Sequence, residues 1–347
     1  MIRRIRLKNF RNYDEITCGF EPGINLVVGE NGLGKTNLIE AVYILARGRS
    51  MRTSETGDLI RKGEKEALIE GWMGEEGRDK AGIVLVEGEE SRKSGHGKLT
   101  AVAFLPDDSQ MVRGNPEMRR KYTDDVIRDI KPGYQEVMRE YARGLRQRNE
   151  AIKRVRRGNA EREEIHYWDE LLVSRGMEVV GERKEILRRM EEELNRLGEF
   201  WEMKNIEIKY YTNLETGEGA RTRNLEKMRM VEEADLRRGA TLVGAHRDEM
   251  IFRMGGKDLR REGSHGEQKI LSLMWRLAHA EIVGMERKER PVILLDDCFS
   301  ELDERNRRAL CRAVEGWGQV IMTATEEVGC LQAGHVIKLE ECHPSRR

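Results

Sequence analysis

No stretch of this 347-residue sequence approaches the ~18 consecutive apolar residues that a membrane-spanning helix needs. The opening Met1–Leu7 is basic and no apolar stretch follows it, so we expect no signal peptide. The five cysteines include no C-x-x-C pair, which argues against a zinc site or a disulfide framework and fits a reducing compartment. Together these absences predict a cytoplasmic protein with no membrane partner.

The sequence also lacks an excess of either charge. Lys plus Arg and Asp plus Glu both number 63, so the formal net charge is zero. A wholly basic, nucleic-acid-coating surface is therefore excluded, although a local basic face is not. Apolar residues make up 38% of the chain and recur periodically, so extensive disorder is not expected. No internal repeat is visible.

Three stretches of different character follow one another along the chain. Residues 1 to about 105 favour short strands around one helix, whereas residues from about 110 to 205 carry apolar side chains at helical spacing. Strand patterns return from about residue 206, and we expect strands at 206–211, 242–243, 319–322 and 335–339. The order predicts an α/β core interrupted by a helical insertion.

The most informative motif is the complete G-x-x-x-x-G-K-T pattern at 29–36. It lies between an apolar strand at 24–28 and helical spacing from Leu38 onward, an arrangement that directs a helix N-terminus at an anion. In such a loop the backbone N–H groups hold phosphates, the lysine reaches the outer phosphates and the threonine hydroxyl binds Mg²⁺. The candidate nucleotide-binding residues are Gly29, Glu30, Asn31, Gly32, Leu33, Gly34, Lys35, Thr36 and Asn37.

A second candidate element is an acidic pair after an apolar strand. The uninterrupted run Val292–Leu295 is typical of a parallel strand buried on both faces, and Asp296 and Asp297 follow it. One carboxylate can orient Mg²⁺, usually through water, and the next can polarise an attacking water. An ordinary strand-end turn is the alternative, since Asp is common in turns.

A third element is the segment 264–269, which precedes a helical pattern. Ser264 and Gly266 stand just before the expected helix N-terminus, where a small hydroxyl and a glycine suit an anion. An ordinary serine N-cap explains the same residues. The residues of this segment alone do not choose between the two.

The order of these elements resembles the ABC-type ATPase superfamily, which includes chromosome-maintenance and double-strand-break repair ATPases. The resemblance implies an ABC-ATPase-like head with an inserted, mainly helical lobe, binding ATP and Mg²⁺. It implies catalytic roles for Lys35 and Asp297, and magnesium ligation by Thr36 and Asp296. The signature Ser264, Gly266 and Gln268 would complete the ATP site of a second chain, and Asp303 would lie in the loop crossing that interface.

The switch histidine of this superfamily has no obvious counterpart. Thr325 stands at the corresponding point after a strand, so we expect it to sense the γ-phosphate. His246 is an alternative, although a structural role beside Arg247 and Asp248 explains it equally well.

Several segments look specifically like the RecF family. They are Leu7–Tyr13, Gly29–Tyr43, Phe104–Asp108, Val112–Arg120, Gln147–Asn149, Thr241–Asp248 and Leu294–Asp303, in the family's order. The chain departs from the family at Ala245, Glu267 and Lys269, where proline, glutamine and arginine are usual. The resemblance implies an ATPase head formed by 1–110 and 206–347, with 111–205 as the helical insertion.

The resemblance further implies a DNA-binding ATPase of recombinational repair. It implies an ATP-dependent homodimer that binds double-stranded and single-stranded or gapped DNA, hydrolyses ATP slowly, and helps load a RecA-type recombinase with RecR-like and RecO-like partners. Transporter-coupled and chromosome-tethering ATPase heads are the alternatives. The long charged lobe fits DNA better than a membrane partner, and about 100 inserted residues are too few for a long coiled-coil arm.

Basic residues gather in the helical stretch, and their role is left open by the sequence. They are Arg119, Arg120, Lys121, Arg139, Arg143, Arg146, Arg148, Lys153, Arg154, Arg156 and Arg157. A shared helical face would bind DNA phosphates without sequence preference. Solvated helix faces with ion pairs to neighbouring Glu residues explain the same pattern.

Overall fold

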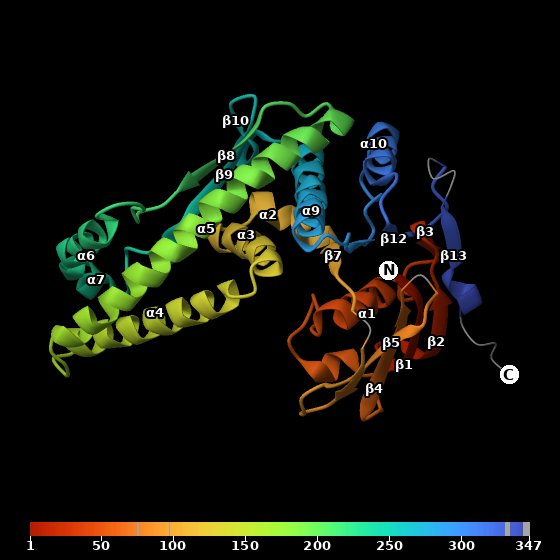
Figure 1. Ribbon diagram of the computed structural model, residues 1–347, viewed down its shortest axis with the longest axis horizontal. Helices are drawn as coiled ribbons and strands as arrows, with labels where there is room; N and C mark the ends of the chain where they lie inside the picture. The colour runs from red at the N-terminus through yellow and green to blue at the C-terminus, as the bar shows by residue number, and fades with distance from the viewer. Residues whose placement is uncertain (75, 97, 330–333, 343–347) are drawn as a thin grey trace. The chain divides into compact units, whose positions relative to one another are not determined.

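The computed structural model describes residues 1–74, 76–96, 98–329 and 334–342 (Figure 1). The chain has a mixed α/β fold and divides into two compact units. Unit 1 comprises Met1–Asp108, Leu197–Glu202 and Leu273–Arg347. Unit 2 comprises Ser109–Arg196 and Met203–Ser272.

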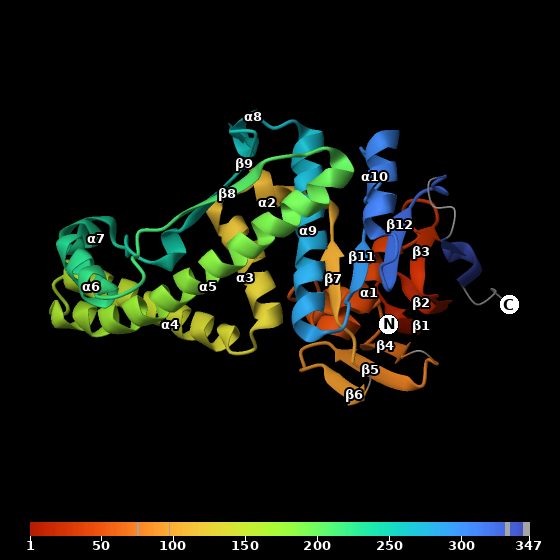
Figure 2. The same ribbon diagram turned by 45° about the horizontal axis from the view of Figure 1, so that its top comes forward.

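The centre of unit 1 is a parallel sheet with the strand order β13-β3-β12-β11-β7, part of which is visible in Figure 2. Its strands are β3 (Gly23–Val28), β7 (Ala101–Phe104), β11 (Val292–Leu295), β12 (Gln319–Ala324) and β13 (His335–Lys338). All neighbouring pairs in this sheet are parallel, so the carboxyl ends of the strands share one edge. Strand β12 lies between β3 and β11, which brings the segments that follow β3 and β11 to neighbouring positions of that edge.

A second sheet of unit 1 is antiparallel, in the order β2-β1-β4-β5-β6. It consists of β1 (Ile2–Phe10), β2 (Tyr13–Gly19), β4 (Glu66–Met73), β5 (Asp79–Val86) and β6 (Arg92–Gly95). Helix α1 (Lys35–Arg47) contributes Leu38 and Val42 to one apolar cluster with Ile5 of β1 and Leu294 of β11. The cluster joins both sheets to this helix and thereby fixes where α1 begins.

The remaining elements of unit 1 are short. They are helix α10 (Glu304–Val314) and the 3₁₀ turns η1 (Thr56–Leu59), η2 (Pro106–Ser109) and η4 (Leu339–Cys342). Helix α9 (His265–Arg287) begins in the part of the chain assigned to unit 2 and continues into the part assigned to unit 1.

Unit 2 is mainly helical. Its helices are α2 (Gln110–Arg113), α3 (Pro116–Ile130), α4 (Tyr134–Arg156), most of α5 (Glu163–Trp201), α6 (Ala220–Met230), α7 (Glu232–Arg238) and α8 (Leu259–Glu262), with the turn η3 (Ala245–Arg247). Helices α4 and α5 run side by side in opposite directions (Figure 1). Two ion pairs between them show this order, since Arg148 pairs with Asp169 and the earlier Glu140 pairs with the later Arg175. A small antiparallel sheet has the order β10-β9-β8, with β8 (Ile206–Tyr211), β9 (Glu249–Met254) and β10 (Lys257–Asp258).

Most predicted elements are confirmed, including the helical stretch and the strands at 206–211 and 319–322. The strand predicted at 335–339 is present as β13 but ends at Lys338, because Leu339 begins the turn η4. The strand predicted at 242–243 is wrong. Side chains satisfy the backbone there instead: the Leu242 N–H donates to Asp235 Oδ1 at 3.0 Å, and the Leu242 carbonyl accepts from Asn213 Nδ2 at 3.0 Å. Backbone groups that already have partners do not need a sheet neighbour.

One further expectation differs from the structure. Cys311 is disulfide-bonded, which the spacing of the cysteines did not indicate.

The boundary between the two compact units falls after Asp108, close to the expected residue 110, but residues 203–272 group with the helical unit rather than with 273–347. The division into a head of 1–110 and 206–347 and a lobe of 111–205 stays a prediction. Among the described residues, no helix has the length and apolar character required to span a bilayer.

Candidate nucleotide-binding site

The phosphate-loop candidate connects the end of β3 to the start of α1. Gly32 and Gly34 have positive φ angles of 90° and 105°, which a residue with a Cβ atom rarely adopts. Gly34 is the N-cap of α1, with no side-chain cap and no acidic residue in the first helical turn. The N–H groups of that turn therefore have no capping side chain, and an anion is favoured at this end of the helix.

Lys35 is placed at the start of this helix and is largely buried. Its Nζ donates to the carbonyl oxygens of Gly29 at 2.6 Å and Glu30 at 3.0 Å. Burial lowers its pKa, and the carboxylates of Asp297 and Asp296 oppose that shift. An ammonium has three donors, so a phosphate oxygen can take one that the loop does not use.

The acidic pair lies beside the phosphate loop, as the sequence predicts. Thr36 Oγ1 donates to Asp296 Oδ2 at 2.8 Å, and Thr323 Oγ1 of β12 donates to Asp296 Oδ1 at 2.8 Å. Asp296 is only 3% exposed, and burial raises its pKa while the two hydroxyl hydrogen bonds lower it. The central strand thus contributes a threonine to the site that sequence analysis did not identify.

The oxygen atoms of Thr36 and Asp296 fit a magnesium ion. Neighbouring ligands of an octahedral Mg²⁺ with bonds of about 2.0 to 2.1 Å are separated by about 2.8 to 3.0 Å, and these two oxygens lie 2.8 Å apart. The described residues contain no group of three or more His, Cys, Asp or Glu able to hold a metal. One carboxylate and one hydroxyl, completed by phosphates and water, is the type of site that Mg²⁺ favours.

Asp297 adopts a left-handed backbone conformation with φ of 45°. Its N–H donates to Thr323 Oγ1 at 2.8 Å, so Thr323 fixes both members of the acidic pair. Asp297 is the larger of the two carboxylate influences on the Lys35 ammonium. Left-handed non-glycine residues are uncommon and concentrate at functional sites, although Asp tolerates this region better than most residues.

The two remaining predicted residues of unit 1 follow the same strands. Thr325 is exposed at the carboxyl end of β12, one residue beyond Ala324, which pairs with Val28 of β3. Asp303 is exposed and caps α10 by accepting from the Asn306 N–H at 2.8 Å. These positions are compatible with contacts to a phosphate and to a second chain, and both roles stay predictions.

The signature candidate starts helix α9 with a reciprocal capping box. Ser264 Oγ accepts from the Glu267 N–H at 3.2 Å, and Glu267 Oε2 accepts from the Ser264 N–H at 2.7 Å. Gln268, in contrast, is buried: its amide donates to the Leu259 carbonyl at 2.7 Å and accepts from Arg113 Nε at 2.5 Å. Its amide therefore supports the segment internally, whereas Ser264 and Gly266 are exposed.

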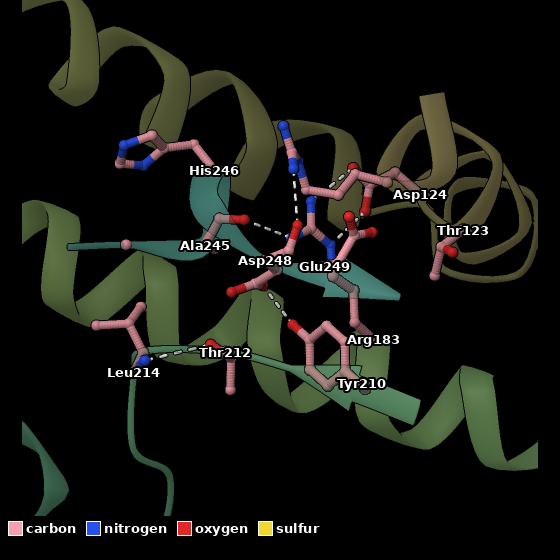
Figure 3. Close-up of polar contacts among 12 residues, drawn as sticks. Thr123, Asp124, Arg183, Tyr210, Thr212, Leu214, Ala245, His246, Asp248 and Glu249 are labelled. Atoms are coloured by element: carbon pink, nitrogen blue, oxygen red, sulfur yellow. Dashed lines mark hydrogen bonds and ion pairs between the residues drawn. The ribbon is translucent and has the colours of Figure 1, made fainter. Parts of the chain in front are cut away.

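Figure 3 shows the polar contacts around Asp248 and Arg183 in unit 2, with His246 close by in the sequence. Because the Thr241 carbonyl can only accept, we assign the His246 proton to Nε2, 3.0 Å away, so that Nδ1 accepts from the Tyr141 hydroxyl at 2.8 Å. Burial lowers the pKa of His246 to about 4, so the ring is neutral at physiological pH. Both ring nitrogens are used within the fold, which favours the structural role considered for this histidine.

Two of the basic residues considered for DNA contact are buried ion-pair centres. Arg119 makes a bidentate pair with Glu249, with both hydrogen bonds at 2.8 Å. Arg148 is fully buried between Asp169 at 2.7 Å and Asp235 at 2.6 Å. Neither can contact DNA without unfolding the surrounding structure. Their burial was not visible from charge patterning.

Comparisons with known proteins extend over almost the whole chain. Residues 1–83 match the model described as the RecF/RecN/SMC N terminal domain. A curated relative from Oceanobacillus iheyensis, named DNA replication and repair protein RecF, is 32% identical over 349 residues, covering 94% of each chain. A relative of the same name from Bacillus cytotoxicus is also 32% identical, covering 94% of this chain and 92% of its own.

Solved structures give the same relationship. One described as the recombination mediator protein RecF-ATPrS in the RecFOR pathway has a TM-score of 0.85 at 26% identity and covers 98% of this chain and 96% of its own. The Smc head domain of Pyrococcus furiosus, at a TM-score of 0.50 and 17% identity, covers 94% of this chain and 89% of its own and shows similarity of fold alone.

Proposed function

This chain belongs to the RecF family of DNA replication and repair proteins, and from that premise we propose that it is an ATP-dependent DNA-binding protein of recombinational and replication-gap repair. It dimerises on binding ATP, recognises gapped or junction DNA, and assists loading of a RecA-type recombinase with RecR-like and RecO-like partners. Slow, DNA-stimulated hydrolysis of ATP resets it. The names of its relatives support the repair role, and structures described with ATP and ATPrS support nucleotide binding.

The observation that carries the proposal is the arrangement around Asp296. A carboxylate fixed by Thr36 and Thr323 lies beside an uncapped helix N-terminus that follows a glycine loop. Phosphates need N–H donors and a cation, and Mg²⁺ needs oxygen ligands next to those phosphates. The site supplies each of these within one unit.

Each residue has a distinct role in the proposed reaction. The loop N–H groups bind the phosphate oxygens, and Lys35 neutralises charge that develops on them during transfer. Thr36 and Asp296 would hold Mg²⁺, which when bound would neutralise phosphate charge and orient the phosphates. Asp297 accepts a hydrogen bond from the attacking water and aligns it with the γ-phosphate.

The proposed dimer makes this site composite. Ser264 and Gly266 are exposed at the start of a 23-residue helix, and in the dimer Ser264 of the partner subunit donates its hydroxyl to the γ-phosphate. The α9 N-terminus adds favourable partial positive charge. ATP thereby links two copies, and hydrolysis releases them.

The DNA-binding proposal rests on one face of α4. Its basic residues recur at intervals of three, four or seven and lie opposite the buried positions of that helix; they are Arg139, Arg143, Arg146, Lys153 and the C-cap Arg157. Glu136 pairs with Arg139, and Glu150 pairs with Lys153. Arg143 and Arg146 are exposed, with no ion pair to any described residue, and are the residues best placed to meet DNA phosphates.

An ATPase assay with and without gapped duplex tests the proposed activity. We expect stimulation by DNA, and a loss of turnover of about 100-fold or more in Asp297→Asn with ATP binding retained, because a positioned base contributes on that order. Asp14→Asn is the control, since Asp14 is an exposed strand residue paired with Arg61. Turnover that ignores DNA and survives Asp297→Asn would contradict the proposal.

A further inference from the structure

A hairpin turn remote in sequence from the phosphate loop contacts the loop from behind. Strands β1 and β2 pair up to Phe10 and Tyr13, leaving Arg11 and Asn12 as the turn. Tyr13 Oη donates to the Gly34 carbonyl at 2.8 Å, and Asn12 Nδ2 donates to the Leu33 carbonyl at 3.1 Å. The two carbonyls belong to successive peptide groups at the end of the loop.

We propose that Asn12 and Tyr13 are positioning residues that set the phosphate-binding geometry of the loop. In a planar trans peptide the carbonyl and the following N–H point in opposite directions. The turn holds the Leu33 carbonyl, and Tyr13 Oη holds the Gly34 carbonyl together with the Leu38 N–H of α1, which donates to it at 3.0 Å. This orientation directs the N–H groups of Gly34 and Lys35 away from the turn. Those are the donors that a phosphate at the α1 N-terminus requires.

The contact is close enough to act on the backbone. An ideal Cβ atom on Gly34 would lie 2.7 Å from Asn12 Oδ1 and 2.8 Å from Tyr13 Oη, so the turn occupies the space that a larger residue would need. Tyr13 is fully buried, and burial raises its pKa, so its hydroxyl stays protonated and keeps donating. Asn12 Oδ1 accepts from Asn37 Nδ2 at 2.8 Å, which orients its amide toward Leu33.

The turn itself is anchored on both sides. Arg11 makes two hydrogen bonds of 2.9 Å to the carboxylate of Glu40, which is fully buried on α1. The Arg11 N–H also donates to the Leu59 carbonyl at 2.8 Å. A turn fixed to the helix and to the chain behind it can hold the loop carbonyls without moving with them.

The test compares Tyr13→Phe and Asn12→Ala with the control Tyr43→Phe. Tyr43 lies on α1 and packs against the core and Arg47 rather than on the loop. A net hydrogen bond is worth about 1 kcal/mol, which corresponds to about fivefold in affinity. We expect Tyr13→Phe and Asn12→Ala each to raise the Kd for ATP, ADP and tripolyphosphate about fivefold. The KM for ATP should rise likewise, with kcat within twofold of wild type.

This inference rests on the proposed nucleotide binding, and the outcomes separate the two. A wild-type chain that binds neither ATP nor ADP overturns the proposed function. A wild-type chain that binds both, with variants whose Kd values match Tyr43→Phe, overturns only the positioning role. If Tyr13→Phe and Asn12→Ala lower Tm or kcat but leave Kd unchanged, the positioning role is likewise overturned. A purely structural contact reduces the folded fraction without changing phosphate affinity.

Discussion

Thr323 offers a sharp test of the site because one hydroxyl serves both acidic residues. It donates to Asp296 Oδ1 and accepts the Asp297 N–H, each at 2.8 Å. Thr323→Val removes both hydrogen bonds with little change of shape. Thr323→Ser keeps the hydroxyl and is the matched control.

The size of the effect follows from the carboxylate that loses its donor. A hydrogen bond to a charged group contributes about 1.5 to 3 kcal/mol, and 1.36 kcal/mol corresponds to one pKa unit. Burial already raises the pKa of Asp296, and the Thr323 hydrogen bond opposes that shift. Losing the bond should raise the pKa of Asp296 by a further ~1 to 2 units. As the pH falls, the ionised Asp296 carboxylate that would hold Mg²⁺ is therefore protonated at a higher pH in the variant than in the wild type.

The assay is ATP turnover at subsaturating Mg²⁺ across pH 5 to 9, with Tm measured in parallel. The acidic limb of kcat/KM should move to higher pH by ~1 to 2 units in Thr323→Val and stay in place in Thr323→Ser. Saturating Mg²⁺ should restore part of the activity of the valine variant at neutral pH. An acidic limb shared by wild type, serine and valine variants would refute the role assigned to Asp296.

Three other perturbations test the dimer interface, the buried ion pairs and the DNA-binding face separately. Glu267→Gln removes a carboxylate from the N-terminus of α9, so ATP-dependent dimerisation, measured by light scattering, should tighten about two- to fivefold; unchanged or weaker dimerisation would place the γ-phosphate elsewhere. Arg148→Met leaves two buried carboxylates without their cation and should lower the free energy of unfolding in urea by about 3–5 kcal/mol, against about 0.5 or less for the exposed Arg143→Met; equal effects would contradict the buried network. Arg143→Glu with Arg146→Glu should weaken duplex binding and flatten its salt dependence by about one unit of slope for each DNA phosphate that is no longer neutralised; an unchanged slope would remove this face of α4 from the DNA site.

The local parts of the site are the parts that the sequence predicts well. The loop at 29–36 and the acidic pair after Val292–Leu295 each combine a motif with a flanking strand, and short-range patterns specify both. Their neighbourhood also follows, because parallel strands place their carboxyl ends at one edge.

The non-local contributions could not be predicted in the same way. Asn12 and Tyr13 meet the loop only because β1 and β2 pair as a hairpin, and Thr323 reaches Asp296 only because β12 lies beside β11. Arg148 stands in the same run of basic residues as its exposed neighbour Arg146. Only the position of Arg148 on the buried face of α4 distinguishes the two. Such interactions depend on which elements pack together, which periodicity alone does not specify.

The most direct test of ATP-linked dimerisation is the mass of the protein measured by light scattering with ATP and Mg²⁺. We expect a dimer with ATP, a monomer without nucleotide, and monomers for Lys35→Arg and Ser264→Arg, which alter the two halves of the composite site. An equal mixture of these two variants should recover partial dimerisation, since one intact composite site forms in each mixed pair. A wild-type chain that stays monomeric with ATP and Mg²⁺, or variants that dimerise as wild type does, would contradict ATP-linked dimerisation.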